Sequence, residues 1–200
     1  MTAERIGGVV LAAGLSTRMG RNKMLLDVAG QTLVRRVVRT ALEAGLDPVL
    51  VVVGHESDRV RAAVADLDCA AVLNPEYAQG MNTSLRAGIA ALPQDVAAAV
   101  VLLGDMPLVD AAMVRTLVAS FRRGQAPLAI STYGGVVAPP IAYGHSLLPE
   151  LRALTAEVCG KSVVKRHRAE AIELAWPPDT LTDLDVPADV QRVLAALEAA

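Results

Sequence analysis

The chain has 200 residues and a mass of 20.9 kDa, a size that suits one compact domain with a full hydrophobic core. Lys and Arg total 19 against 21 Asp and Glu, so there is no excess of positive charge to hold a nucleic acid. Only 2% of the residues are aromatic, which argues against the stacking surfaces that bind single-stranded nucleic acids. We therefore expect a single domain over residues 1–200 and no nucleic-acid partner.

Two further features bear on the location of the protein. No apolar run approaches the ~20 residues that a membrane-spanning helix needs, so we expect no membrane partner. Cys69 and Cys159 lie far apart and form no paired motif, which makes a disulfide framework or a zinc site unexpected. These features favour a reducing compartment, the cytoplasm.

Short apolar runs alternate with longer amphipathic ones, the pattern of βα units around a mostly parallel sheet. The runs predict strands over residues 6–12, 48–54, 70–73, 97–103, 128–132, 135–142 and 171–176. The predicted helices cover residues 32–44, 58–67, 83–92, 110–123 and 148–154, with a last helix from Pro187 onward. We expect an α/β fold with helices on both faces of the sheet.

A glycine-rich loop, LAAGLSTRMGRNK in residues 11–23, follows the first predicted strand. Gly14 and Gly20 allow the backbone to turn tightly and to aim N–H groups inward, where they can hold phosphate oxygens. Arg18 and Lys23 add positive charge to the same loop. The spacing fits neither the GxxxxGK[ST] nor the GxGxxG phosphate loop. The loop therefore predicts a local phosphate site, and the alternative is an ordinary connection between a strand and a helix.

Asp105 directly follows the apolar run 97–103, at the carboxyl end of a predicted strand. Ligands bind at that edge of open α/β sheets, and a carboxylate there can hold a divalent cation. The alternative is a turn, because Gly-Asp-Met-Pro favours a turn without any ligand. The residues alone leave both interpretations open.

Polar residues also gather in three other segments. Asn82, Thr83 and Ser84 precede a predicted helix, for which all three are common N-cap residues. Asp183 and Asp185 point to the same side if their segment is extended, and the alternative is capping of the last helix. A cationic cluster suits either a solvated helix end or a phosphate site for a second substrate; its members are Lys161, Lys165, Arg166 and Arg168.

The loop resembles the LAAGxSxRMGxxK signature of nucleotidyltransferases in the molybdenum-cofactor group, the molybdopterin guanylyl- and cytidylyltransferases. Sugar-phosphate nucleotidyltransferases are more distant relatives of that group. The resemblance continues through residues 23–26, Gly30, 80–85, 104–107 and 183–189, and so covers nearly the whole chain. It implies a Rossmann-like, three-layer nucleotidyltransferase fold.

The resemblance also implies roles for individual residues. Arg18, Lys23 and Asp105 are the implied catalytic residues. Asp105 matches the Mg²⁺-binding aspartate of the family, and Asp183 or Asp185 is implied as a second metal ligand. The implied nucleotide-binding residues are Ala12, Ala13, Gly14, Ser16, Arg18, Gly20, Lys23, Gly80, Asn82 and Ser84. Asn82 departs from the family, which has a serine there, and Val186 stands where the family usually has a hydroxyl.

The reaction implied is Mg²⁺-dependent transfer of CMP from CTP to the phosphate of the molybdopterin cofactor, with release of pyrophosphate. The sequence Ala12-Ala13-Gly14 resembles the AAG of cytidylyl-transferring members, whereas guanylyl members usually carry AGG. The methyl group of Ala13 would crowd a purine. GTP as the donor and a sugar or polyol phosphate as the acceptor remain alternatives. A non-catalytic nucleotide-binding module that regulates or chaperones a molybdoenzyme is another, with the apo-molybdoenzyme as its candidate partner.

Overall fold

The computed structural model describes residues 4–155, 160–182 and 187–198. Its main sheet has seven strands in the order β5-β4-β1-β6-β8-β7-β9. The strands are β1 (Ile6–Ala12), β4 (Val49–Val53), β5 (Ala70–Leu73), β6 (Ala98–Leu103), β7 (Leu128–Tyr133), β8 (Val136–Gly144) and β9 (Ile172–Trp176). A separate two-stranded hairpin is formed by β2 (Asp27–Val28) and β3 (Gln31–Thr32).

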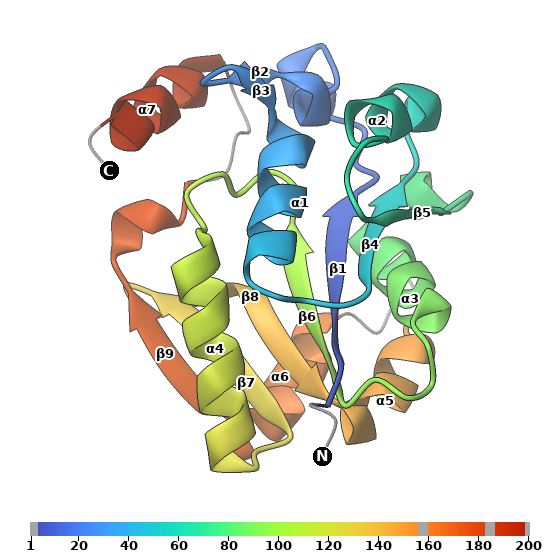
Figure 1. Ribbon diagram of the computed structural model, residues 1–200, viewed down its shortest axis with the longest axis vertical. Coiled ribbons are helices and arrows are strands. Elements are labelled where there is room, and N and C mark those ends of the chain that lie inside the picture. The colour runs from blue at the N-terminus through green and yellow to red at the C-terminus, as the bar shows by residue number, and fades with distance from the viewer. Residues whose placement is uncertain (1–3, 156–159, 183–186, 199–200) are drawn as a thin grey trace.

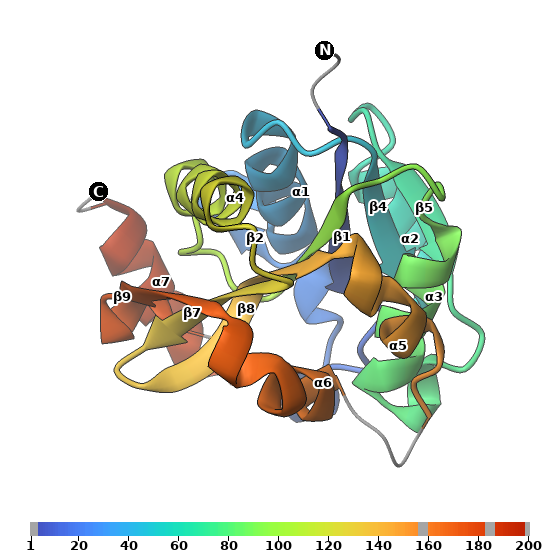
Figure 2. The ribbon, with the colours of Figure 1, turned by 90° about the horizontal axis from the view of Figure 1, so that it is seen from below.

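Helices cover both faces of the sheet (Figures 1 and 2). They are α1 (Leu33–Glu43), α2 (Ser57–Ala63), α3 (Met81–Ala91), α4 (Ala111–Gly124), α5 (Leu148–Arg152), α6 (Gly160–His167) and α7 (Pro187–Glu198). Apolar residues of α1, α2 and α4 form a core with one face, and those of α3, α5 and α6 form a core with the other. The predicted three-layer α/β fold is confirmed. No helix in the described ranges is long and apolar enough to cross a membrane.

The sheet is mostly parallel, as expected, because β1, β4, β5 and β6 run in one direction and β7 pairs in parallel with β9. The exception is β8, which is antiparallel to both β6 and β7. Its hairpin with β7 turns at Gly134 and Gly135, both of which have positive φ. The first four parallel strands therefore present their carboxyl ends at one edge of the sheet.

Two elements were not predicted from the sequence. The β2–β3 hairpin is too short to show alternation, and α7 packs through Val193 against Val28 of the hairpin and Leu33 at the start of α1. Helix α6 was interpreted only as a charged segment, although Val163 and Val164 bury its apolar side in the core.

Helix α4 agrees with its prediction, because Asp110 caps it by accepting a hydrogen bond from Met113 N at 2.8 Å.

Helix α3 approaches the sheet closely at Gly88. An added Cβ there would lie 2.4 Å from Val9 Cγ1 and 2.8 Å from Val52 Cγ2. We expect Gly88→Ala to lower the free energy of unfolding by about 1–3 kcal/mol, because overpacking outweighs the gain in helix propensity. Ala90→Ser, on the exposed side of α3, should change it by less than about 0.5 kcal/mol. Denaturant unfolding of both variants tests this, and a Gly88→Ala variant more stable than the wild type would contradict it.

Candidate active site

The glycine-rich loop leaves β1 at the carboxyl edge of the sheet and folds back through a 3₁₀ turn at Thr17–Met19. Ser16 has φ +54° and Gly20 has φ +65°, so the turn begins and ends in left-handed conformations. A left-handed serine is strained, and its hydroxyl helps to hold the turn by accepting a hydrogen bond from Lys23 N at 3.1 Å. The loop thereby brings Lys23 back toward the end of β1.

Asp105 comes to the same place from β6. Gly104 N donates to Leu11 O at 2.9 Å, and a Cβ on Gly104 would lie 3.0 Å from that oxygen and 2.8 Å from Met24 Sδ. This close approach sets Asp105 beside Lys23, with Lys23 Nζ 2.6 Å from Asp105 Oδ2. The exposed fractions of the two side chains are 13% and 18%, so the ion pair is largely withdrawn from water.

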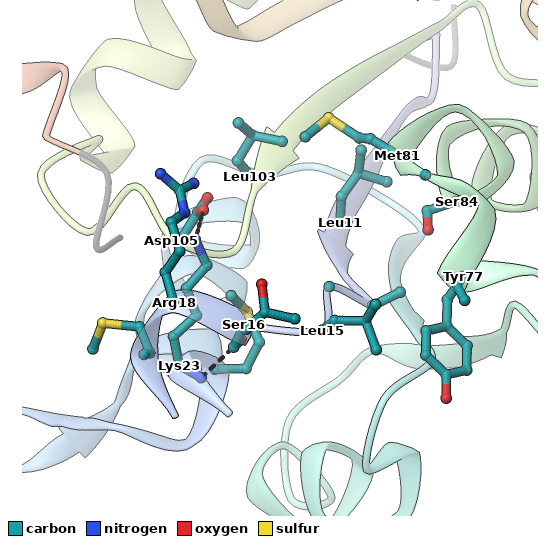
Figure 3. Close-up of a pocket in the computed structure, with 17 residues that line it drawn as sticks. Leu11, Leu15, Ser16, Arg18, Lys23, Tyr77, Met81, Ser84, Leu103 and Asp105 are labelled. Atoms are coloured by element: carbon teal, nitrogen blue, oxygen red, sulfur yellow. Dashed lines mark hydrogen bonds and ion pairs between the residues drawn. The ribbon is translucent and has the colours of Figure 1, made fainter. Parts of the chain in front are cut away.

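A pocket of about 330 Å³ opens between these charged groups and α3. Figure 3 shows Arg18, Lys23 and Asp105 on one side and Tyr77, Met81 and Ser84 on the other. The predicted site residues that line the pocket are Ala13, Gly14, Ser16, Arg18, Lys23, Gly80, Ser84 and Asp105. Segments far apart in the sequence therefore meet here, as the resemblance to the nucleotidyltransferases implies.

Other predicted site residues lie elsewhere. Ala12 is buried in the core on the opposite face of β1, and Gly20 lines a neighbouring pocket. Asn82 binds the α5–α6 connection, since its Nδ2 donates to Thr155 O and its Oδ1 accepts from Gly160 N, both at 3.3 Å. Asp183 and Asp185 lie outside the described residues.

The interpretation of Asn82, Thr83 and Ser84 as capping residues is wrong. Helix α3 begins at Met81, with Gly80 in the N-cap position and no side-chain cap. All three therefore lie within the first turns of the helix. Thr83 and Ser84 are buried, and Ser84 faces the pocket.

The pocket also has apolar wall residues that sequence reasoning missed. Tyr77 belongs to the 3₁₀ turn Tyr77–Gln79 and packs so closely on Gly54 that a Cβ there would lie 2.5 Å from Tyr77 Cβ. Leu15 and Met81 line the pocket and have 43% and 61% of their surface exposed. In the sequence, Tyr77 could have been connected with the site only because it lies three residues before Gly80, an implied nucleotide-binding residue.

A second pocket of about 590 Å³ lies on the other side of the loop, where Gly20 and Arg21 meet His55, Glu56 and Arg59. The hydrogen bond from Arg59 lowers the pKa of Glu56, so this carboxylate is charged and offsets part of the positive charge. His55 lies just after β4 at the carboxyl edge of the sheet, with its backbone N–H donating to Ala13 O at 3.3 Å.

The cationic cluster carries less available charge than its sequence suggests. Arg166 pairs with Glu150, and Arg168 pairs with Glu173 at 2.9 Å. His167 also contacts Glu150, through Nε2 at 2.9 Å, and this contact contributes most to lowering the pKa of that glutamate. The cluster therefore belongs in part to the contacts that join α6 to α5 and β9.

The pocket fits a divalent cation of the magnesium type. Mg²⁺ is usually bound by one or two carboxylates together with water and substrate phosphates. Asp105 supplies one such carboxylate beside the phosphate-type loop. Within the described ranges no group of three or more His, Cys, Asp or Glu residues could form an all-protein cage. A cation here would therefore need oxygen ligands besides those of the described side chains, and substrate phosphates can supply them.

Comparison with known proteins gives two kinds of sequence match. The chain is 32% identical over 188 residues to the bifunctional protein GlmU of Anaeromyxobacter sp. (strain K), a match covering 88% of this chain and 38% of that protein. It is 36% identical over 123 residues to a probable molybdenum cofactor guanylyltransferase of Opitutus terrae, covering 62% of this chain and 59% of that protein. The chain spans only about a third of the length of the GlmU proteins that it matches.

Solved structures share the fold over nearly the full chain. Rv0371c from Mycobacterium tuberculosis H37Rv superimposes with a TM-score of 0.85 at 29% identity, covering 97% of this chain and 100% of that one. A manganese complex of Rv0371C superimposes with a TM-score of 0.77 at 28% identity, covering 96% and 99%. A model of the MobA-like NTP transferase domain matches residues 8–171, a range that contains every residue lining the pocket. The chain therefore belongs to the family of MobA-like NTP transferase domains.

Proposed function

We propose that this protein is a nucleotidyltransferase that joins CMP from CTP to the phosphate of the molybdopterin cofactor and releases pyrophosphate. The observation that carries the proposal is the Lys23–Asp105 pair at 2.6 Å, set beside a glycine-rich loop in one pocket. Phosphoryl transfer needs a positively charged side chain that binds phosphate close to a carboxylate that can bind a metal ion. The family match supports the reaction type, and the name of the Opitutus relative supports the acceptor.

Positively charged residues have one role in this proposal and carboxylates have another. Arg18 and Lys23 bind the triphosphate, and backbone N–H groups between Gly14 and Gly20 bind its oxygens. Asp105 would hold Mg²⁺, which would neutralise negative charge on the phosphates. Asp183 or Asp185 is the proposed second carboxylate.

Bond making and breaking follow from this arrangement. An oxygen of the acceptor phosphate attacks the α-phosphorus of CTP in line, and the bond from that phosphorus to the β-phosphate oxygen breaks, so that pyrophosphate leaves. The attacking phosphate is already ionised, and no residue has to remove a proton. Arg18 and Lys23 hold the leaving pyrophosphate and stabilise its charge, so catalysis consists of positioning and electrostatics.

The reaction is tested by incubating each nucleoside triphosphate with molybdopterin or a sugar phosphate and measuring pyrophosphate. We expect release with CTP and molybdopterin. Release only with a sugar or polyol phosphate would move the acceptor assignment to that alternative. Nucleotide binding with no release for any acceptor would contradict the enzyme and favour the regulatory or chaperone module.

We base the choice between CTP and GTP on Ala13, a residue that lines the pocket and is 4% exposed. Glycine at this position would leave more room for a purine. We expect Ala13→Gly to raise kcat/KM for GTP relative to CTP by about tenfold, since one methyl group discriminates by about 1–3 kcal/mol. Competition between the two nucleotides in wild type and variant measures this ratio. A wild type that prefers GTP, as the name of the Opitutus relative suggests, would contradict the CTP assignment.

A further inference from the structure

Asn74, just after β5, is a buried side chain that the proposed mechanism does not use; it is 2% exposed. Its Nδ2 donates to Thr83 Oγ1 and to Ser84 Oγ, both at 2.9 Å, and its Oδ1 accepts from Glu76 N at 3.0 Å. A backbone N–H can only donate, so the amide oxygen must face Glu76. The amino group of Asn74 must therefore face the two hydroxyls.

The proton of Thr83 is already committed to the backbone. Its hydroxyl donates to Gly80 O at 2.9 Å and to Glu76 O at 3.0 Å. Asn74 is itself tied to β4, since its N–H donates to Val53 O at 2.8 Å. This network fixes the segment between β5 and α3, which supplies Tyr77 and Gly80 to the pocket wall.

Ser84 differs from Thr83 in the use of its proton. Its oxygen accepts from Asn74, and within the described part of the chain it has no other hydrogen-bond partner. A hydroxyl that accepts from an amide keeps its own proton for another acceptor. Ser84 lines the pocket opposite Lys23 and Asp105, where a group bound in the pocket can accept that proton (Figure 3).

We propose that Asn74 is a positioning residue that makes Ser84 a hydrogen-bond donor to the bound nucleotide. The ligand atom is an acceptor on the nucleoside part, a base carbonyl or ring nitrogen or a ribose oxygen, because the charged groups that suit the phosphates lie across the pocket. This inference rests on the proposed nucleotide substrate. Asn74 decides whether the Ser84 hydroxyl donates or accepts in the pocket, which the position of Ser84 on the pocket wall does not decide by itself.

Asn74→Asp tests the direction of the hydrogen bond with almost no change in shape. The carboxylate keeps an oxygen for Glu76 N but has no proton for Ser84, so Ser84 donates to it and turns its proton away from the pocket. We expect CTP to bind about 3- to 10-fold more weakly, the loss that one neutral hydrogen bond corresponds to. Ser84→Ala, which needs no buried charge, should weaken binding to a similar extent.

The double variant Asn74→Asp/Ser84→Ala separates this role from a structural one. Both single changes remove the same donor, so the double variant should bind CTP no more weakly than the weaker single variant. Losses that multiply would overturn the proposal, as would wild-type affinity in either single variant. Calorimetric titration with CTP and Mg²⁺, without an acceptor, gives all four dissociation constants.

Ser131→Ala is the matched control for loss of stability. Ser131 is fully buried and donates to Pro140 O at 2.8 Å, between β7 and β8. This variant should lower the melting temperature without changing CTP affinity, and an equal loss of affinity would overturn the specific role of Asn74. The binding assay contains no acceptor and is therefore independent of transfer. A wild type that binds CTP here but releases no pyrophosphate when acceptors are supplied contradicts the proposed transfer alone. A wild type that binds no nucleotide contradicts both.

Discussion

Asp105→Asn is expected to lower pyrophosphate release by about 10³-fold while the protein stays folded. The amide has nearly the shape of the carboxylate but lacks the charge that binds a divalent cation. Loss of charge stabilisation at a phosphoryl centre costs several kcal/mol, and about 1.4 kcal/mol corresponds to a factor of ten. The side chain lies at the pocket rather than in a core, so the change should leave the fold intact.

The measurement is pyrophosphate release at saturating CTP and acceptor, over a range of Mg²⁺ concentrations. Asp68→Asn is the matched control, because Asp68 is exposed and precedes β5 at the opposite edge of the sheet. We expect wild-type release from that control. Wild-type release from Asp105→Asn would refute the metal role, and rescue of its rate by higher Mg²⁺ would show weakened binding of the metal.

Much of the fold follows from local patterns in the sequence. All seven strands of the main sheet and the helices from α1 to α5 lie where apolar runs and amphipathic spacing predict them. The direction of β8 could not be predicted, because an apolar run has the same pattern in parallel and antiparallel strands. Helix α6 was not predicted because most of its residues are polar or charged, and its buried residues are only Val163 and Val164.

Candidate-site residues that belong to a sequence motif could be predicted. Residues whose contacts depend on tertiary packing could not. The loop with Lys23 was singled out by its glycines and cations after a predicted strand, and Asp105 by its place at a strand end together with the family resemblance. Asn74 was not, because its bonds to Thr83 and Ser84 depend on how α3 begins, and the sequence placed the helix start too late. A buried hydrogen-bond network arises from tertiary contacts, which a local pattern does not report.

The Lys23–Asp105 ion pair suggests that Lys23 and a metal ion compete for the carboxylate of Asp105. Lys23→Met should lower kcat/KM for CTP by about 10²-fold, because it replaces the partly buried cation that we propose binds the phosphates by an apolar chain. The same change frees Asp105 from its counter-charge. In the absence of nucleotide, Lys23→Met should therefore bind Mn²⁺ more tightly than the wild type does, even though it is the poorer enzyme.

These two opposite effects distinguish Lys23 from a merely structural residue. Lys165→Met is the matched control, since Lys165 is exposed on α6 and should leave both the KM for CTP and the Mn²⁺ affinity unchanged. Titration with Mn²⁺, followed by the paramagnetic resonance of the free ion, measures the metal affinity without turnover. Weaker Mn²⁺ binding in Lys23→Met would contradict competition between Lys23 and the metal. Because Lys23 lies 2.6 Å from Asp105, a nucleotide whose phosphates drew the lysine away would uncover the carboxylate for a metal, so we expect nucleotide and metal to bind cooperatively.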